Sequence, residues 1–159
     1  MDSIPRCLQC RIKSLGIWPI IGKIKKNALE DIWVTLDEYH GHRLLNIRSY
    51  FHAADGPHPT RKGIAIETSK LPQLRDALHS QSANRCDGTQ VMRIAKGKKV
   101  EIRIYASEYM GRQLMNIRVF YPTDDAAEKR PGRGIAFSVN LIDELIRILD
   151  VAARHLAAV

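Results

Sequence analysis

Two stretches of the chain alternate regularly between hydrophobic and polar residues. Residues 32–37 and residues 100–107 place an aliphatic side chain at every second position, with a polar, charged or aromatic residue between. This period of two is typical of a half-buried β-strand. Gly41 and Gly111 follow these stretches, and each predicts a tight turn into a second strand.

The two stretches belong to an internal repeat. Residues 38–48 recur as residues 108–118 at a constant offset of 70, and after a one-residue slip residues 61–66 match residues 132–137. The slip falls in segments rich in proline, glycine, aspartate and alanine, which are typical of a hairpin loop that absorbs an extra residue. We therefore interpret the chain as two copies of one structural unit.

Each copy reads as strand, turn, strand, loop, strand and helix. Leucines within residues 71–78 predict a first helix of only about two turns, whereas an apolar stripe over residues 141–156 predicts a much longer second helix. The expected fold class is α+β, with a tandem duplicated unit. Each unit is an antiparallel β-sheet followed by a C-terminal helix that covers one face.

The repeat divides the chain into four segments that we expect to differ in structure. The first segment is rich in basic residues, and the third is largely polar. The expected segments are a basic N-terminal extension (residues 1–28), a first unit (residues 29–80), a linker (residues 81–97) and a second unit with the longer helix (residues 98–159).

The charge balance points to a polyanionic partner. The chain has 159 residues, with 25 Lys and Arg against 17 Asp and Glu, a formal net charge of +8 and a sequence pI near 9.6. A domain this basic most often meets nucleic acid. No run approaches the ~18 consecutive apolar residues of a transmembrane helix, so we expect no membrane partner.

Candidate metal ligands and nucleophiles are sparse. Cys7 and Cys10 form a Cys-x-x-Cys pair, but Cys86 stands alone, and zinc needs about four ligands. His40 and His42 have methionine and arginine at their positions in the second copy, which favours surface histidines. We therefore expect reduced thiols, no metal, no cofactor and no enzymatic activity.

One face of each predicted sheet carries aromatic and basic side chains together. Phosphates need cations and unpaired bases need flat surfaces, so such a face is typical of single-stranded nucleic-acid binding. The alternative is that these aromatic residues pack against a partner subunit or a loop. By alternation the face carries Trp33, Asn46, Arg48 and Tyr50 in the first copy, and Arg103, Tyr105, Asn116, Arg118 and Phe120 in the second.

Residues 33–51, residues 61–66 and the helix around residues 74–78 closely resemble the positive-cofactor-four family of transcriptional coactivators. The second copy is similar to the same family over residues 117–121 and 129–135. Such proteins form homodimers of one unit, with a curved antiparallel sheet and a C-terminal helix at the dimer contact, and they bind single-stranded or melted DNA with little sequence preference. The resemblance implies that this chain is a monomer whose two units form an intramolecular pseudo-dimer.

The resemblance also implies a set of DNA-binding residues. They comprise the aromatic residue after the first strand, the aromatic residue that closes the second strand, an arginine within that strand, and basic residues in the turn and before the third strand. In the first copy these are Tyr39, Arg43, Arg48, Phe51, Arg61 and Lys62. In the second copy they are Tyr109, Arg112, Arg118, Tyr121, Lys129, Arg130 and Arg133, and the polar face adds Arg103.

The chain departs from the family pattern in two places. Asp37 and Ser107 stand where the family has a basic residue, which weakens phosphate contact at that point. Pro59 and Thr60 replace the Pro-Gly pair that the second copy keeps. The two DNA channels are therefore expected to be unequal.

These observations predict a non-enzymatic protein of the transcriptional coactivator type that binds single-stranded or melted DNA through base stacking and phosphate contacts. Transcription regulation, replication and repair all expose such strands, and the sequence leaves the process open. The alternatives are an RNA-binding protein and a protein-interaction module for a transcription factor or polymerase. We expect an intracellular protein of the nucleoid or nucleus, and the basic N-terminal segment leaves organelle targeting open.

Overall fold

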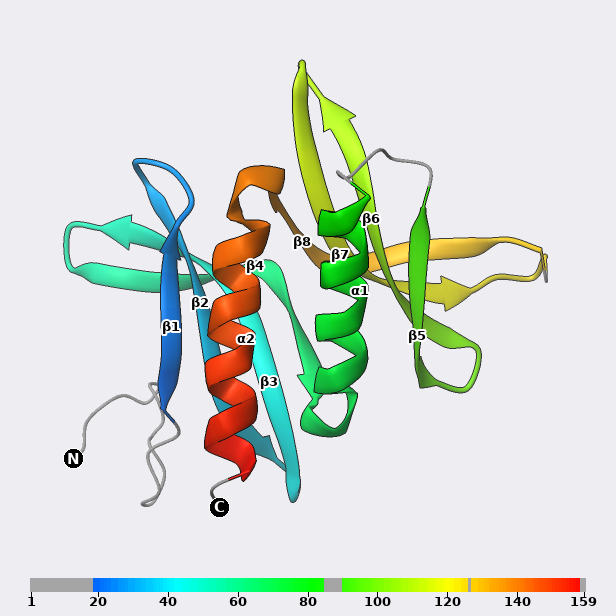
Figure 1. The fold of residues 1–159 in the computed structure, drawn as a ribbon, viewed down its shortest axis with the longest axis horizontal. Helices are drawn as coiled ribbons and strands as arrows, with labels where there is room; N and C mark the ends of the chain where they lie inside the picture. Colours follow the sequence, from blue (N-terminus) through cyan, green and yellow to red (C-terminus); the bar gives the residue numbers. More distant parts are fainter. Residues whose placement is uncertain (1–18, 85–89, 126, 158–159) are drawn as a thin grey trace.

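The computed structural model describes residues 19–84, 90–125 and 127–157, which fall into two similar halves (Figure 1). The first half contains β1 (Ile20–Lys25), β2 (Glu30–Tyr39), β3 (His42–Ala53), β4 (Gly56–Glu67) and α1 (Leu71–Ala83). The second half contains β5 (Val91–Gly97), β6 (Val100–Tyr109), β7 (Arg112–Pro122), β8 (Lys129–Ser138) and α2 (Ile142–Ala157). A short 3₁₀ turn, Thr68–Lys70 or Val139–Leu141, precedes each helix.

Each half is one antiparallel sheet whose strands follow one another in chain order, β1-β2-β3-β4 and β5-β6-β7-β8. We call residues 20–83 the first unit and residues 91–157 the second unit. This arrangement confirms the α+β class and the tandem duplicated unit, in which a sheet is followed by a helix. Each sheet contains one more strand than the sequence predicted.

The additional strands, β1 and β5, lie in the ranges expected to form an N-terminal extension (residues 1–28) and a linker (residues 81–97). Each strand contributes one fully buried side chain to the core, Ile24 in β1 and Ile94 in β5. Gly22 and Met92 also face the helices, but one of them is glycine and the inward positions are too few for a clear hydrophobic alternation. The two sheets therefore begin earlier in the chain than expected.

Helix α1 has 13 residues, which is longer than the two turns predicted. Its last turn carries Gln81, whose buried amide donates hydrogen bonds to the backbone carbonyls of Gln90 (2.9 Å) and Ile104 (2.8 Å) in the second half. The Ser82 hydroxyl in the same turn donates a hydrogen bond of 3.2 Å to Asp143 of α2, so polar residues at the end of this helix make contacts across the molecule. Tertiary contacts of this kind override a weak local pattern.

Each helix packs mainly against the sheet of the other unit (Figure 1). Helix α2 lies against β1 and β2, helix α1 lies against β5 and β6, and the two helices lie side by side. Strands β4 and β8 meet where the two sheets approach each other. The contact between β1 and α2 is close, because a Cβ atom on Gly22 would lie only 2.8 Å from the Ile148 side chain. The buried aliphatic residues of both units form one core.

The β2–β3 and β6–β7 connections are the tight turns that the glycines predicted. His40 and Gly41 have φ angles of 52° and 81°, and Met110 and Gly111 have φ angles of 52° and 78°. Two consecutive residues with positive φ are typical of a type I′ turn, whose twist matches that of the flanking strands. The two units therefore end these hairpins in the same way.

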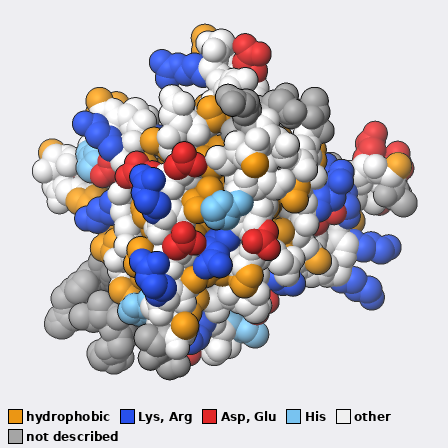
Figure 2. Space-filling view, viewed as in Figure 1, with side chains coloured by type: hydrophobic (Ala, Val, Ile, Leu, Met, Phe, Trp, Pro, Cys, Tyr) orange, Lys and Arg blue, Asp and Glu red, His pale blue; other side chains and the backbone are white. Residues whose placement is uncertain are grey.

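The helices do not present a uniform surface. On the face that shows α1 and α2, acidic and basic side chains are interspersed (Figure 2). Neither of the two described helices is long and apolar enough to span a membrane. A cationic binding site is therefore expected on the sheets and on the turns between their strands, not on this helical face.

Candidate nucleic-acid interface

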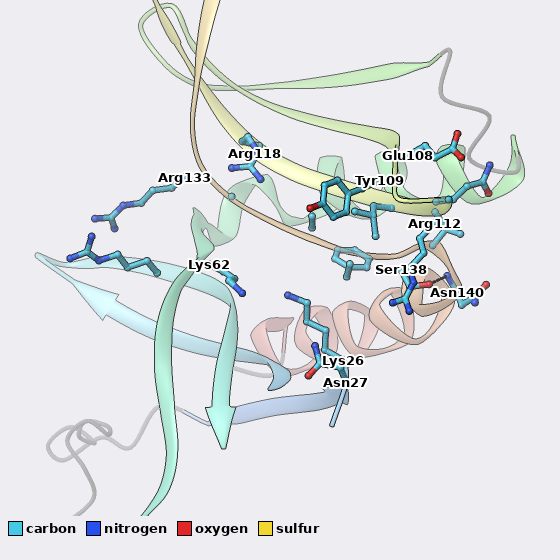
Figure 3. A pocket seen from close by; sticks show the side chains of 18 residues that line it. Lys26, Asn27, Lys62, Glu108, Tyr109, Arg112, Arg118, Arg133, Ser138 and Asn140 are labelled. Carbon is cyan, nitrogen blue, oxygen red and sulfur yellow. Dashed lines mark hydrogen bonds between the residues drawn. The ribbon is translucent and has the colours of Figure 1, made fainter. Parts of the chain in front are cut away.

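A groove of about 1420 Å³ lies between the β6–β7 hairpin of the second unit and the β1–β2 turn and β4 of the first (Figure 3). Side chains of both units line it, so neither unit forms it alone. Its described lining includes one carboxylate, Glu108, against six cationic side chains. The cations are Lys26, Arg61, Lys62, Arg112, Arg118 and Arg133. This inter-unit groove has the charge that a phosphodiester backbone requires.

Tyr109 lines the inter-unit groove and is 65% exposed. It is the last residue of β6, and it pairs across the hairpin with Arg112. Tyr39 occupies the same place in the first unit, is 64% exposed and pairs with His42. An exposed aromatic ring beside cations can stack on an unpaired base. Both tyrosines thus lie where the sequence predicted them, at the ends of strands and accessible to a ligand.

Arg48 and Arg118 occupy equivalent positions on β3 and β7, and both are half-buried. The Nη1 atom of Arg48 donates a hydrogen bond of 2.9 Å to the Thr60 carbonyl. In the same way, Arg118 donates one of 2.9 Å to the Gly132 carbonyl. Burial lowers the pKa of Arg48, and the nearby charge of Arg133 lowers it further.

Glycines in the neighbouring strands make room for these two arginines. Gly63 of β4 pairs with Arg48, and Gly134 of β8 pairs with Arg118. A Cβ atom would lie 2.9 Å from Arg48 atoms at the first position and 2.7 Å from Arg118 atoms at the second. The close approach of the neighbouring strand thus explains why the repeat has glycine at both positions, 63 and 134.

Phe51 and Tyr121 have different surroundings. Phe51 is 40% exposed near the end of β3. Tyr121 is half-buried against the core, and the guanidinium carbon of Arg130 lies 5.3 Å from its ring centre. The ring also lies so close to Gly132 that a Cβ atom there would clash with it. Tyr121 therefore offers less free ring surface to a base than Phe51 does.

Comparison with known proteins places this arrangement in a family. The model of the family described as Transcriptional Coactivator p15 (PC4) matches residues 26–77 and 94–148, one region in each unit. The chain belongs to the PC4 family. The crystal structure of a PC4 homologue from Burkholderia pseudomallei is 30% identical, with a TM-score of 0.39, and the alignment covers 41% of this chain and 89% of the homologue. No curated protein matches the chain.

The basic residues that the PC4 resemblance assigns to the turn are not equivalent in the structure. Arg112 is the first residue of β7, pairs with Tyr109, is exposed and lines the inter-unit groove. Arg43 pairs with Glu38, one register step further along, and is half-buried. Because neighbouring residues of a strand point to opposite faces, the first-unit position that corresponds to Arg112 is His42.

Two of the other predicted cations make contacts within their own sheet. Arg103 donates a hydrogen bond to Glu101, and its guanidinium lies 4.3 Å from the ring centre of Phe120. Lys129 donates a hydrogen bond of 2.6 Å to the backbone carbonyl of Lys99. Neither residue is part of the lining of the inter-unit groove.

The aromatic residues predicted on the polar face also contact one another. Trp33 stacks on Tyr50 with ring centres 4.0 Å apart and an angle of 12° between the planes. The ammonium of Lys23 lies 4.2 Å from the ring centre of Trp33. These two rings therefore pack on each other within one sheet, an arrangement that differs from the predicted alternative of packing against a partner subunit or a loop.

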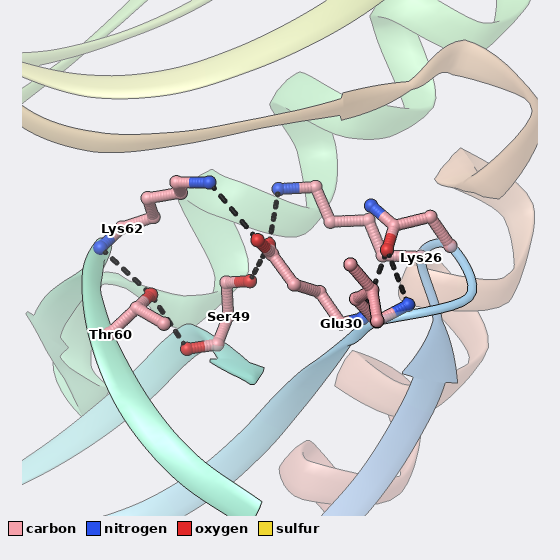
Figure 4. A network of polar contacts seen from close by, with 7 residues as sticks. Lys26, Glu30, Ser49, Thr60 and Lys62 are labelled. Carbon is pink, nitrogen blue, oxygen red and sulfur yellow. Dashed lines mark hydrogen bonds and ion pairs between the residues drawn. The ribbon is translucent and has the colours of Figure 1, made fainter. Parts of the chain in front are cut away.

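Glu30 holds two lysines of the groove in place (Figure 4). Its carboxylate accepts hydrogen bonds from Lys62 (3.2 Å), Lys26 (3.4 Å) and the Ser49 hydroxyl (2.5 Å). The bond from Ser49 and the two lysines lower the pKa of Glu30, and burial opposes this effect. The ionised carboxylate therefore fixes the positions of both ammonium groups at the groove wall.

Lys26 and Asn27 line the groove but were not among the predicted residues. The sequence placed them in an extension outside the first sheet. The repeat itself held an indication, because at the same offset of 70 Ile24 matches Ile94 and Lys26 matches Lys96. Extending the repeat over these positions would have placed Lys26 inside the first unit and not in an N-terminal extension.

The three cysteines, Cys7, Cys10 and Cys86, lie outside the described residues. The prediction of reduced thiols therefore stays a prediction. Within residues 19–84, 90–125 and 127–157, no group of three His, Cys, Asp or Glu side chains is arranged to hold a metal ion.

Proposed function

We propose that this chain binds single-stranded or melted DNA without catalysing a reaction, and that the strand lies in the inter-unit groove. The observation that carries the proposal is the composition of the groove, where six cations from two units surround an exposed tyrosine. Cations follow a phosphate backbone, and stacking on an aromatic ring contributes about 1–3 kcal/mol per base. Such binding would serve transcription, replication or repair, in the nucleoid or nucleus.

The position of the helices supports a preference for single strands with little sequence dependence. Direct readout of a duplex needs an element that enters the major groove, which is about 12 Å wide, and presents donors and acceptors to base edges. Helices α1 and α2 pack against each other and against the sheets, and acidic residues are interspersed on their outer face (Figure 2). Every base has an aromatic face, so stacking discriminates little between bases.

We also propose that one chain provides what two copies of a single-unit relative would provide. The contact between α2 and β1 pairs Ile148 with Gly22. The repeat-equivalent positions are Ala77 in α1 and Met92 in β5. Pairing two first units would set Gly22 near Ala77 and leave a void, whereas pairing two second units would crowd Met92 against Ile148.

This size match supports pairing of unlike units, and the covalent connection gives that pairing a high effective concentration. Light scattering should therefore give the mass of one chain, 18.0 kDa, at micromolar concentration. Twice that mass, unchanged on dilution, would contradict the monomer.

The test of DNA binding is a fluorescence anisotropy titration with a labelled oligonucleotide of about 20 bases at increasing salt concentrations. We expect the affinity to fall steeply with salt, and Arg133→Ala to reduce the log–log slope by about 0.7 for one lost phosphate contact. Arg154→Ala, an exposed position on α2, is the control and should leave the slope unchanged.

Failure to bind at low salt, or binding that does not depend on salt, would contradict the proposal and favour a protein-interaction module. An unlabelled RNA strand of the same sequence serves as competitor. Stronger competition by RNA than by DNA would contradict the assignment to DNA.

A further inference from the structure

The surface around Tyr109 has a counterpart around Tyr39, and the two differ in charge at several repeat-equivalent positions, three of which place carboxylates or histidine in the first unit. We call them the Tyr109 site and the Tyr39 site. The Tyr109 site has Ser107, Arg112 and Ser138, and the Tyr39 site has Asp37, His42 and Glu67. With histidine neutral, these three positions carry a net charge of +1 at the Tyr109 site and −2 at the Tyr39 site. Arg43 and Lys70, which stand where the second unit has Gln113 and Leu141, return part of that difference.

The two carboxylates of the Tyr39 site are held by neighbouring side chains. The Nδ1 atom of His42 lies 3.2 Å from a carboxylate oxygen of Glu67. Asp37 accepts a hydrogen bond of 3.2 Å from the side-chain amide of Asn46. In the second unit the equivalent asparagine donates to the Ser107 hydroxyl at 2.8 Å. A phosphate would thus meet fixed negative charges at one site and hydroxyl groups at the other, and like charges repel.

A lysine of the second unit lies beside Glu67 of the Tyr39 site. The Nζ atom of Lys96 donates a hydrogen bond of 3.0 Å to the Ala65 carbonyl in β4. Together with Glu67 it lines a cavity of about 150 Å³. Its repeat equivalent, Lys26, instead contacts an acidic residue of its own unit and lines the groove of about 1420 Å³. Lys96 therefore contacts the other unit beside the Tyr39 site, whereas the equivalent Lys26 contacts its own unit beside the larger groove.

We propose that one chain holds one DNA strand tightly, at the Tyr109 site, and that the carboxylates of Asp37 and Glu67 repel a phosphate backbone from the Tyr39 site. This inference rests on the proposed DNA binding and adds the number of strands that a chain can hold. The first unit then acts chiefly as one wall of the groove, to which it contributes Lys26, Arg61 and Lys62.

A matched pair of variants tests the inequality. Tyr109→Ala and Tyr39→Ala remove equivalent rings that are 65% and 64% exposed, so both chains should fold. With an oligonucleotide of about eight bases, Tyr109→Ala should weaken binding at least ~10-fold and Tyr39→Ala less than about twofold. Equal losses would overturn the inequality, whereas failure of the unmodified chain to bind would overturn the proposed function itself.

Stoichiometry gives an independent measurement. Isothermal titration calorimetry of the unmodified chain should give one short oligonucleotide per chain. The triple variant Asp37→Ser, His42→Arg and Glu67→Ser copies the Tyr109 site onto the first unit and should bind a second. Two oligonucleotides on the unmodified chain, or one on the folded triple variant, would contradict the proposal.

The control for the triple variant changes charge on another face of the molecule. Gln73→Lys, Asp76→Asn and His79→Arg together raise the net charge by three, as the triple variant does, on exposed positions of helix α1. This variant should keep one oligonucleotide per chain. A second oligonucleotide on the control would show that net charge alone, not the Tyr39 site, governs the count.

Discussion

The guanidinium of Arg118 donates a hydrogen bond of 2.9 Å to the backbone carbonyl of Gly132. This bond ties the side chain of β7 to β8 at the wall of the inter-unit groove. Arg48 makes the same bond to Thr60 in the first unit, where the surrounding charges differ. A comparison of variants at the two arginines can therefore separate the effect of this hydrogen bond on stability from the effect of the guanidinium on DNA binding.

Replacement of either arginine by alanine should lower the free energy of unfolding by a similar amount, about 1–2 kcal/mol, because the same hydrogen bond is lost. Only Arg118→Ala should also reduce the salt dependence of DNA binding, by about 0.7 in the log–log slope. Denaturant unfolding and anisotropy titrations measure the two effects. An equal reduction of the slope in Arg48→Ala would contradict the placement of the strand beside Arg118.

Phe51 and Tyr121 should respond differently to alanine because only Tyr121 packs against the core. Tyr121→Ala should lower the free energy of unfolding by about 2–4 kcal/mol, as expected when a partly buried aromatic ring is removed. Phe51→Ala, which removes a ring that is 40% exposed, should lower it by less than half of that amount. Equal destabilisation of the two variants in urea would contradict this difference in packing.

An alanine at position 22 should weaken the contact between the units. Its Cβ atom would lie 2.8 Å from the Ile148 side chain, so α2 would have to move away from β1. Overpacking of this kind costs about 1–3 kcal/mol. Gly97→Ala is the matched control, because a Cβ atom there has nothing within 4 Å.

Combining Gly22→Ala with Ile148→Ala should recover part of the lost stability, because the second change makes room for the first. If Gly22→Ala and Gly97→Ala unfold at the same urea concentration, α2 does not cover β1 as described.

The contacts of Glu30 predict a pH-dependent part of the stability. Folding lowers the pKa of Glu30 below 4.5, so its ionised form stabilises the fold above that pH, and this contribution is lost as the pH falls through the folded-state pKa. Glu30→Gln should therefore be less stable than the unmodified chain at neutral pH, and the difference should shrink in acid. Urea unfolding from neutral pH to about pH 3 measures it.

Ser49→Ala should reduce the same pH-dependent part, because the Ser49 hydroxyl makes the largest contribution to the lowered pKa. A stability difference that stays constant across this pH range would show that the charge of Glu30 does not matter.

The inner strands could be predicted because each has several inward positions in regular alternation. Tyr39 and Tyr109 were named only through the family resemblance, and their exposure at the ends of β2 and β6 is a finding of the structure. Alternation also placed Trp33 and Tyr50 on one face. It could not show that their rings stack on each other, which depends on how the long side chains fill the space above the sheet.

The inter-unit groove could not be predicted from the repeat. Its walls bring together residues such as Lys62 and Arg118, which belong to different units. Their proximity depends on how β4 meets β8 and on the exchange of helices between the sheets. No pattern within a single unit contains that information, so the sequence named six lining residues without showing that they share one groove.

A competition measurement tests most directly whether the groove takes a single DNA strand. A labelled single strand of about 20 bases is bound to the chain at about 150 mM salt and displaced by unlabelled DNA of the same sequence, either single-stranded or duplex. Because Tyr109 can stack only on an unpaired base, the single strand should displace the label at a concentration at least ~10-fold lower than the duplex. Displacement by both forms at the same concentration would contradict the account.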